Sequence, residues 1–154
     1  MSETRLTPAQ LTQHVGTKLG ISTWIQVDQV RIDEFAHCTG DRQWIHVDVE
    51  RAQRERPNVG TVAHGYLTLS LVAPTLFEIL SSLVATKEAI NYGLDKVRFP
   101  AFVRSGARVR NHIKLMAVED KGQGRFLLTT ENSFEIESET KPGLVATALV
   151  VVAG

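Results

Sequence analysis

The feature that most limits how this chain folds is a stretch from Pro57 to Phe77 that contains no Asp, Glu, Lys or Arg. Its second part begins a helix that we predict over residues 65–81. Apolar side chains cover most of the circumference of that helix. They are Leu67, Leu69, Leu71, Val72, Leu76, Phe77, Ile79 and Leu80. A helix of this composition is buried on nearly all sides. Pro74 removes its hydrogen bond to the carbonyl of Ser70, so we expect a bend there.

The same stretch approaches the length of about 20 apolar residues that a transmembrane helix needs. Its first half, PNVGTVAHGYLT, is polar and rich in turn-forming residues, and only the part from about Tyr66 onward is apolar. We therefore expect no membrane span. The helix has to be covered by other parts of the same domain.

The second half of the chain supplies that cover, because it is rich in strands. Four runs have strand character: residues 91–99, 107–120, 125–138 and 144–153. The KGQG sequence between the second and third runs predicts a hairpin, and the last run is apolar on both faces, as in a central strand. With 154 residues, 43% of them hydrophobic, the chain suits a single α+β domain over residues 1–154. An antiparallel sheet that curls around the apolar helix would account for both the helix of the first half and the strands of the second half.

The first half predicts short elements with clear boundaries. Residues 7–13 suit a short helix, and residues 22–28 a short strand. Asp28 caps a helix that ends at Gly40, and Asp48 caps another, VERAQRE. The segment between Gly40 and Asp48 has no helical pattern, so we expect a loop there.

That loop carries the first candidate for chemistry, Asp41 and His46 in TGDRQWIHVD. A carboxylate and an imidazole on one short loop can share the protons of a water molecule, because one accepts a proton while the other orients or donates. Spacing alone favours another interpretation, in which Asp41 is a turn residue after Gly40 and His46 bonds to backbone groups.

The second candidate lies at the start of the apolar helix, in VAHGYLTLS. Free N–H groups at a helix N-terminus stabilise negative charge, and Gly65 lets a ligand approach the backbone closely. These are the requirements of an oxyanion hole. Taken alone, the same residues fit the commoner case better, with Gly65 serving close packing and His64 making a local hydrogen bond.

The charges of the chain balance but are unevenly placed. Lys plus Arg number 17 and Asp plus Glu number 17, so no overall field directs the protein to nucleic acid or to an anionic membrane. From Lys96 to Lys114 there are six cations and no carboxylate. A solvated sheet face is the simpler interpretation of most of these cations, and a subset could meet phosphates.

Metal and thiol chemistry have little support in the sequence. Cys38 is the only cysteine, which excludes an intramolecular disulfide and a thiolate-rich metal site. His37, His46, Asp41 and Asp48 offer no recognised ligand spacing, so we expect no metal. The N-terminal MSETRLTPAQ lacks the apolar region of a signal peptide, and a reducing, cytoplasmic location is the simplest expectation.

With both candidate segments in view, the chain resembles the MaoC-like dehydratase family, and within it the (R)-specific enoyl-CoA hydratases, also called hydratase 2, with their NodN-like relatives. The family signature is present, in order, as Phe35, Gly40, Asp41, Ile45, His46, Asp48 and Ala52. The later AHG with Thr68 and Ser70, and the run INYGLDKVRFPAFVRSG, also resemble family members.

The resemblance implies a hot-dog fold, in which an antiparallel sheet wraps one long helix, and a homodimer. It implies that Asp41 and His46 together activate water, without metal or organic cofactor. The N–H of Gly65, with His64 beside it, is implied to hold the thioester oxygen as it becomes enolate-like. The expected reaction is reversible syn hydration of trans-2-enoyl-CoA to (3R)-3-hydroxyacyl-CoA.

Two alternatives stay open beside this reaction. One is dehydration of a 3-hydroxyacyl chain carried by acyl-carrier protein, and the other is a non-catalytic subunit that binds acyl thioesters. The chain also departs from the family pattern, since many members carry Asn-Pro where it has Gln43 and Trp44. This change bears on the shape of the loop and the width of the acyl pocket.

A CoA thioester would divide its contacts between two parts of the chain. We expect the uncharged helix region to meet the acyl chain, and one or more of Arg98, Arg104 and Arg108 to contact the CoA phosphates. Because one small domain offers limited depth, the binding tunnel is expected to depend on the dimer interface.

Overall fold

The computed structural model describes residues 5–154, and a six-stranded antiparallel sheet forms its framework. The strand order is β1-β4-β5-β6-β3, and β2 also pairs with β4. The strands are β1 (Lys18–Ile21), β2 (Ile25–Val27), β3 (Glu88–Arg98), β4 (Ala107–Gly122), β5 (Arg125–Ile136) and β6 (Leu144–Ala153). The four long strands follow the predicted runs, and β1 is a strand that the sequence pattern did not predict.

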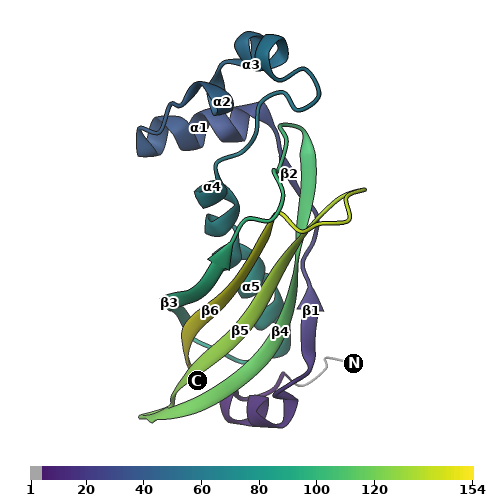
Figure 1. The fold of residues 1–154 in the computed structure, drawn as a ribbon. Helices are drawn as coiled ribbons and strands as arrows, with labels where there is room; N and C mark the ends of the chain where they lie inside the picture. Colours follow the sequence, from purple (N-terminus) through teal and green to yellow (C-terminus); the bar gives the residue numbers. More distant parts are fainter. Residues whose placement is uncertain (1–4) are drawn as a thin grey trace.

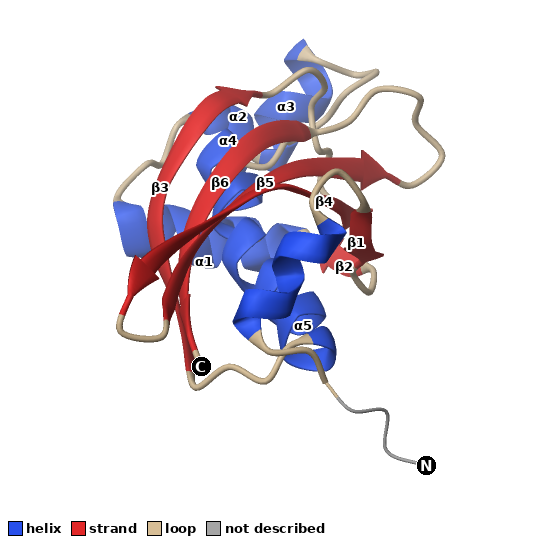
Figure 2. Ribbon diagram, turned by 90° about the horizontal axis from the view of Figure 1, so that it is seen from below, coloured by secondary structure: helices blue, strands red, loops and turns tan. Residues whose placement is uncertain are grey.

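The helices divide into two groups. They are the 3-10 helix η1 (Pro8–His14) and the α-helices α1 (Gln29–Thr39), α2 (Trp44–Val47), α3 (Val49–Glu55), α4 (Gly65–Ser70) and α5 (Val72–Leu83). Figure 1 shows α1, α2 and α3 together at one end of the sheet. Figure 2 shows the strands curving around α5. This is the predicted hot-dog arrangement, with the long helix packed against the sheet.

The apolar helix provides the centre of the core. Leu67, Val72, Leu76 and Leu80 are buried against apolar residues of β4, β5 and β6. The stretch Gly65–Leu83 is long and apolar enough to cross a membrane by length and mean hydropathy. Core helices of folded domains meet the same criteria, and its packing against the sheet is that of a core helix.

The predicted bend near Pro74 is present as a break in the helix, whereas the predicted burial on nearly all sides is wrong. The helix is interrupted at Leu71, in the turn before Pro74, because the proline ring crowds the carbonyl four residues earlier and supplies no N–H. The helix is also not buried on nearly all sides, since Tyr66 and Phe77 are 71% and 54% exposed. Both lie beside β3, where an open groove separates the helix from the edge of the sheet.

The local boundary signals of the first half are confirmed. The carboxylate of Asp28 accepts from the Arg31 N–H at 2.9 Å, and Gly40 ends α1 in a left-handed conformation with φ of 83°. Asp48 caps α3 in the same way. The segment between them is not all loop, because Trp44 to Val47 form one helical turn, α2.

β3 is the exposed edge of the sheet. Within the described chain it pairs only with β6, and its residues are exposed or half-buried along its whole length. Ile90, Tyr92 and Leu94 are large apolar side chains on this exposed strand. A long apolar edge of this kind is available for pairing with another chain.

A group of polar side chains is buried beneath α5, and we call it the core asparagine cluster: Asn111, Asn132, Thr75 and Thr130. Asn111 Nδ2 donates to Thr75 Oγ1 at 3.0 Å and to Asn132 Oδ1 at 2.9 Å. Asn132 Nδ2 in turn donates to Thr130 Oγ1 at 3.0 Å. These bonds tie β4, β5 and α5 together inside the apolar core.

Candidate active site

Asp41 and His46 lie on the short connection between α1 and α3. Gly40 turns the chain out of α1, so that Asp41 follows immediately, and α2 carries His46. His46 is 7% exposed, and its Nδ1 donates to the Val62 carbonyl at 2.7 Å. This bond fixes the ring and leaves Nε2 as the atom available for proton transfer.

A backbone frame from distant parts of the chain holds His46 in place. The Val62 N–H donates to the Ile45 carbonyl at 3.1 Å, and the Ala63 N–H donates to the Val103 carbonyl at 2.7 Å. Residues 61–63 therefore lie between α2 and residues 103–105. The hydrogen-bond partner of His46 is itself fixed on both sides.

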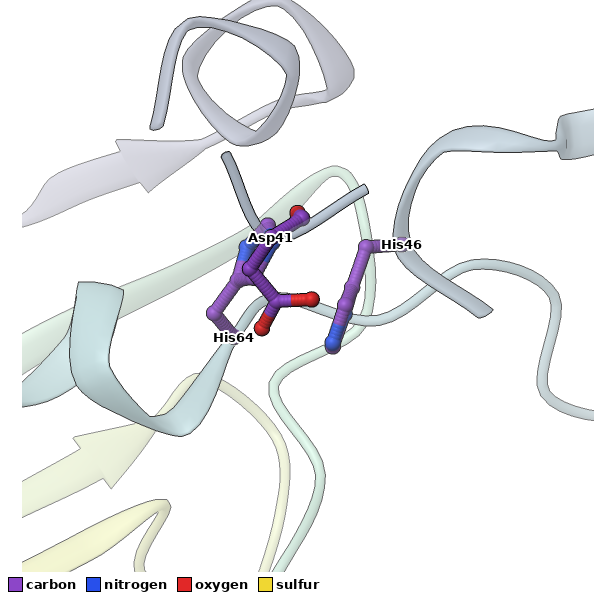
Figure 3. Close-up of side chains that lie close together, drawn as sticks. All are labelled: Asp41, His46 and His64. Atoms are coloured by element: carbon purple, nitrogen blue, oxygen red, sulfur yellow. The ribbon is translucent and has the colours of Figure 1, made fainter. Parts of the chain in front are cut away.

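His64 joins the pair as a third member. Its Nε2 donates to the backbone carbonyl of Asp41 at 2.9 Å, and its ring stacks on that of His46 with centroids 3.8 Å apart. Figure 3 shows the Asp41 carboxylate directed toward His46, with His64 beside it. His64 is 3% exposed, and its Nδ1 has no hydrogen-bond partner within the described residues. We call Asp41, His46 and His64 the active-site cluster.

Burial controls the charge of His46. It lowers the pKa of the imidazole below its ordinary value, since the charged ring would lose its hydration. The bond to Val62 and the nearby Asp41 carboxylate act in the opposite direction, while His64 and Arg56 add to the lowering. His46 is therefore neutral at pH 7, with a lone pair on Nε2.

The cluster also has the composition of a possible metal site, which sequence spacing did not reveal. One ligand atom from each of Asp41, His46 and His64 lies within 4.8 Å of the others. Two imidazoles share a metal when the lone pairs in their ring planes converge on it. Here the rings stack with an interplanar angle of 24°, so their lone pairs lie in nearly parallel planes. This geometry suits proton transfer better than metal binding.

Gly65 begins α4 directly after His64. As the first helical residue, it has an N–H without an acceptor inside the helix. A Cβ at this position would stand 3.2 Å from three ring carbons of Phe99. A side chain here would therefore push the Phe99 ring aside, and glycine lets the ring cover the helix start closely.

A small pocket of about 180 Å³ connects His46 and Gly65. Its wall is otherwise mainly apolar and includes Ile45, Phe99 and Phe102. A larger groove, with Tyr66 in its wall, runs between the helix and β3. It consists of two hollows of about 420 and 270 Å³ that share Ala73 and Asn91, and no charged residue lines either.

The three arginines expected near phosphates occupy different environments. Arg108 forms a two-point ion pair with Glu137, and Arg98 donates to the carbonyl of Val97 at 2.7 Å. Arg104 lies opposite Val62 in an antiparallel bridge, next to the frame of His46. Arg56, which no sequence pattern singled out, is also close to this site.

Comparison with known proteins identifies the class. Residues 10–135 match the MaoC-like domain family, so the chain belongs to the MaoC-like dehydratases and is a hydro-lyase. It is 45% identical over 142 residues to 3-hydroxyacyl-thioester dehydratase Z of Mycobacterium tuberculosis, covering 92% of this chain and 93% of the relative. It is 42% identical over 147 residues to nodulation protein N of Rhizobium leguminosarum, covering 96% and 91%.

Solved structures support the same fold. A protein of Archaeoglobus described as a monoamine oxidase regulatory protein superposes with a TM-score of 0.81 at 20% identity, covering 99% of this chain and 97% of that one. The (R)-hydratase of A. caviae superposes with a TM-score of 0.68 at 21% identity, covering 88% and 94%. At these identities the likeness establishes the hot-dog fold.

Proposed function

We propose that the protein catalyses the reversible hydration of trans-2-enoyl-CoA to (3R)-3-hydroxyacyl-CoA. The observation that carries the proposal is the active-site cluster itself. A neutral imidazole and a carboxylate face each other, fixed through His64 and Val62, beside the free N–H of Gly65. These are an acid/base pair and an anion-stabilising donor at one place.

The chemistry requires two proton movements. A water oxygen adds to C3 of the enoyl thioester while one of its protons passes to the Asp41–His46 pair. The C2–C3 double-bond electrons move toward the thioester oxygen, which becomes enolate-like and is stabilised by the Gly65 N–H. The pair then delivers a proton to C2, so that one water is added and the enzyme returns to its starting state.

The groove beside β3 suits the acyl chain. Its lining includes Leu69, Val72, Leu94 and Ala148, and it starts next to Tyr66, the residue after Gly65. An apolar chain leaving the reacting carbons could follow the groove toward Leu76 and Val150. Arg104, beside the opposite pocket, is the best placed of the three expected phosphate contacts, because Arg108 already has a carboxylate partner.

The reverse reaction, dehydration of a 3-hydroxyacyl thioester, is the second candidate. The relative named 3-hydroxyacyl-thioester dehydratase Z favours it at 45% identity. The same residues serve both directions, so the two candidates differ in the physiological substrate and its carrier. A non-catalytic role as an acyl-binding subunit would leave the acid/base pair without a purpose.

The direct test is a hydration assay with crotonyl-CoA, followed by the loss of absorbance of the conjugated thioester. We expect turnover without added metal, and a product of (3R) configuration by chiral analysis. Dehydration of (3R)-3-hydroxybutyryl groups on CoA and on carrier protein would then rank the two carriers. Absence of turnover in both directions would refute the proposed function.

We also propose that the protein is a homodimer joined along β3. The strand offers unpaired backbone groups, and Ile90, Tyr92 and Leu94 would be covered by a second copy. A partner along β3 would also close the open side of the acyl groove. Sedimentation equilibrium should give twice the 17.0 kDa chain mass, and a monomer at micromolar concentration would contradict this arrangement.

A further inference from the structure

Arg56 is presented from a fixed point at the end of α3. Its N–H donates to the Ala52 carbonyl at 2.8 Å, and its own carbonyl accepts from the N–H groups of Val59 and Gly60, each at 2.9 Å. The backbone is therefore anchored on both sides. Arg56 itself is half-buried, so its side chain has a restricted set of positions.

The guanidinium of Arg56 lies at the edge of the small pocket. It is 5.1 Å from the centroid of the Phe102 ring, and Phe102 lines the pocket together with His46 and Gly65. Phe102 is 64% exposed, so the pair faces solvent at the pocket entrance. The cation is also close enough to His46 to act on its ionisation. The guanidinium therefore lies near both the exposed Phe102 ring and the reacting groups.

Three arginines have acidic partners within 4.0 Å. The ion pairs are Arg51 with Glu55, Arg108 with Glu137 and Arg110 with Glu135. Among residues 5–154, neither Arg56 nor Arg104 has a carboxylate within 4.0 Å. A guanidinium held in place without a counter-ion is suited to a planar, two-point contact with phosphate oxygens.

We propose that Arg56, assisted by Arg104, binds the phosphate of the phosphopantetheine arm of the substrate at the entrance of this pocket. This inference rests on the proposed function, because it assumes a thioester at Gly65. CoA and acyl-carrier protein both carry this phosphate, so the contact serves either carrier. The acyl groove and the phosphate contact then lie on opposite sides of Gly65 and Tyr66, and the thioester is stretched across the active-site cluster.

The test compares three crotonyl thioesters that differ in phosphate: crotonyl-CoA, crotonyl-4′-phosphopantetheine and crotonyl-pantetheine. We expect Arg56→Gln to raise KM about 10-fold for crotonyl-CoA and crotonyl-4′-phosphopantetheine. This factor corresponds to the loss of one charge-assisted hydrogen bond. KM for crotonyl-pantetheine, which has no phosphate, should change much less. Arg104→Gln should act in the same direction with a smaller effect, and added salt should reduce the difference.

Arg125→Gln is the matched control, since Arg125 is an exposed arginine at the β4–β5 hairpin. Equal changes for all three thioesters, or no change for any, would refute the phosphate contact. A change confined to crotonyl-CoA would also refute it, because the adenosine phosphates would then be responsible. Calorimetry of CoA binding to wild type and Arg56→Gln tests the contact independently of turnover, and equal affinities would refute it. Inactivity toward every thioester would therefore count against the proposed function alone.

A crotonyl carrier-protein substrate separates the two sources of the phosphate. A matching rise in KM with Arg56→Gln supports the same contact for the protein-bound arm. If KM for the carrier-protein substrate is unchanged while KM for crotonyl-4′-phosphopantetheine is raised, the contact belongs to the small-molecule thioesters.

Discussion

Two groups of polar side chains use their hydrogen bonds in different ways. In the core asparagine cluster, the donors of Asn111 and Asn132 bond to side chains within the cluster. In the active-site cluster, the side chains of His46 and His64 bond to backbone carbonyls, those of Val62 and Asp41. His46 Nε2 and the Asp41 carboxylate are thereby left for a substrate. The first arrangement stabilises the fold, and the second keeps reactive atoms available.

The largest expected effect is on catalysis by the active-site cluster. Asp41→Asn and His46→Gln should each lower the crotonyl-CoA hydration rate by roughly 10²- to 10⁴-fold, the contribution of a positioned acid or base. The melting temperature of Asp41→Asn should stay close to wild type, because Asp41 is exposed. Steady-state kinetics and thermal denaturation check both statements. Full activity in both variants would remove the cluster from the mechanism.

Substitutions in the core asparagine cluster should lower stability and leave catalysis unchanged. Asn132→Leu removes the acceptor of one Asn111 donor and the donor to Thr130, and each unsatisfied buried group costs about 1–3 kcal/mol. We expect that loss in the free energy of unfolding by urea, with kcat unchanged in the folded enzyme.

The double variant Asn111→Leu/Asn132→Leu sharpens this prediction. Removing both partners leaves fewer unsatisfied groups. The double variant should therefore lose less free energy of unfolding than the two single variants lose in sum. Strictly additive losses would show that the two side chains do not depend on each other.

The smallest effect concerns pH. Burial lowers the pKa of His46 in the folded protein, while an unfolded histidine titrates near 6.5. As pH falls through that value, the unfolded chain takes up the proton first, so this histidine reduces stability in acid and has no such effect above it. Urea unfolding of His46→Gln at pH 5 and pH 8 should therefore show a smaller acid loss than wild type. An identical loss would contradict the lowered pKa.

Sequence patterns predicted the parts of the fold that depend on neighbouring residues. The caps Asp28 and Asp48 and the glycine stop at Gly40 act within one helical turn, so their residue types were sufficient. The hairpin at KGQG formed for the same reason, and its last three residues all take positive φ. The proximity of Asp41 to His46 also follows from their place on one short segment, but spacing alone favoured structural roles for both, and only the resemblance to MaoC-like proteins implied a shared chemical role.

The remaining parts of the site depend on contacts between distant residues. His64 reaches Asp41 across 23 positions, and no spacing rule links a helix start to such a partner. The turn α2 was missed because four residues have little helix-forming tendency of their own. The Arg108–Glu137 pair was hidden for a related reason: two register shifts separate it from the hairpin, and the hairpin register extended without them would place Arg108 opposite Glu139.

The frame around His46 has a consequence for the order in which the protein folds. Residues 61–63 are held by residues 103–105, about 40 positions later in the chain, so the frame closes only after that segment is in place. Contacts between distant residues form slowly, because the loop between them must be closed first. During synthesis, the segment that carries Asp41 and His46 leaves the ribosome well before residue 103. The positioning of His46 against Val62 is therefore a late event in folding.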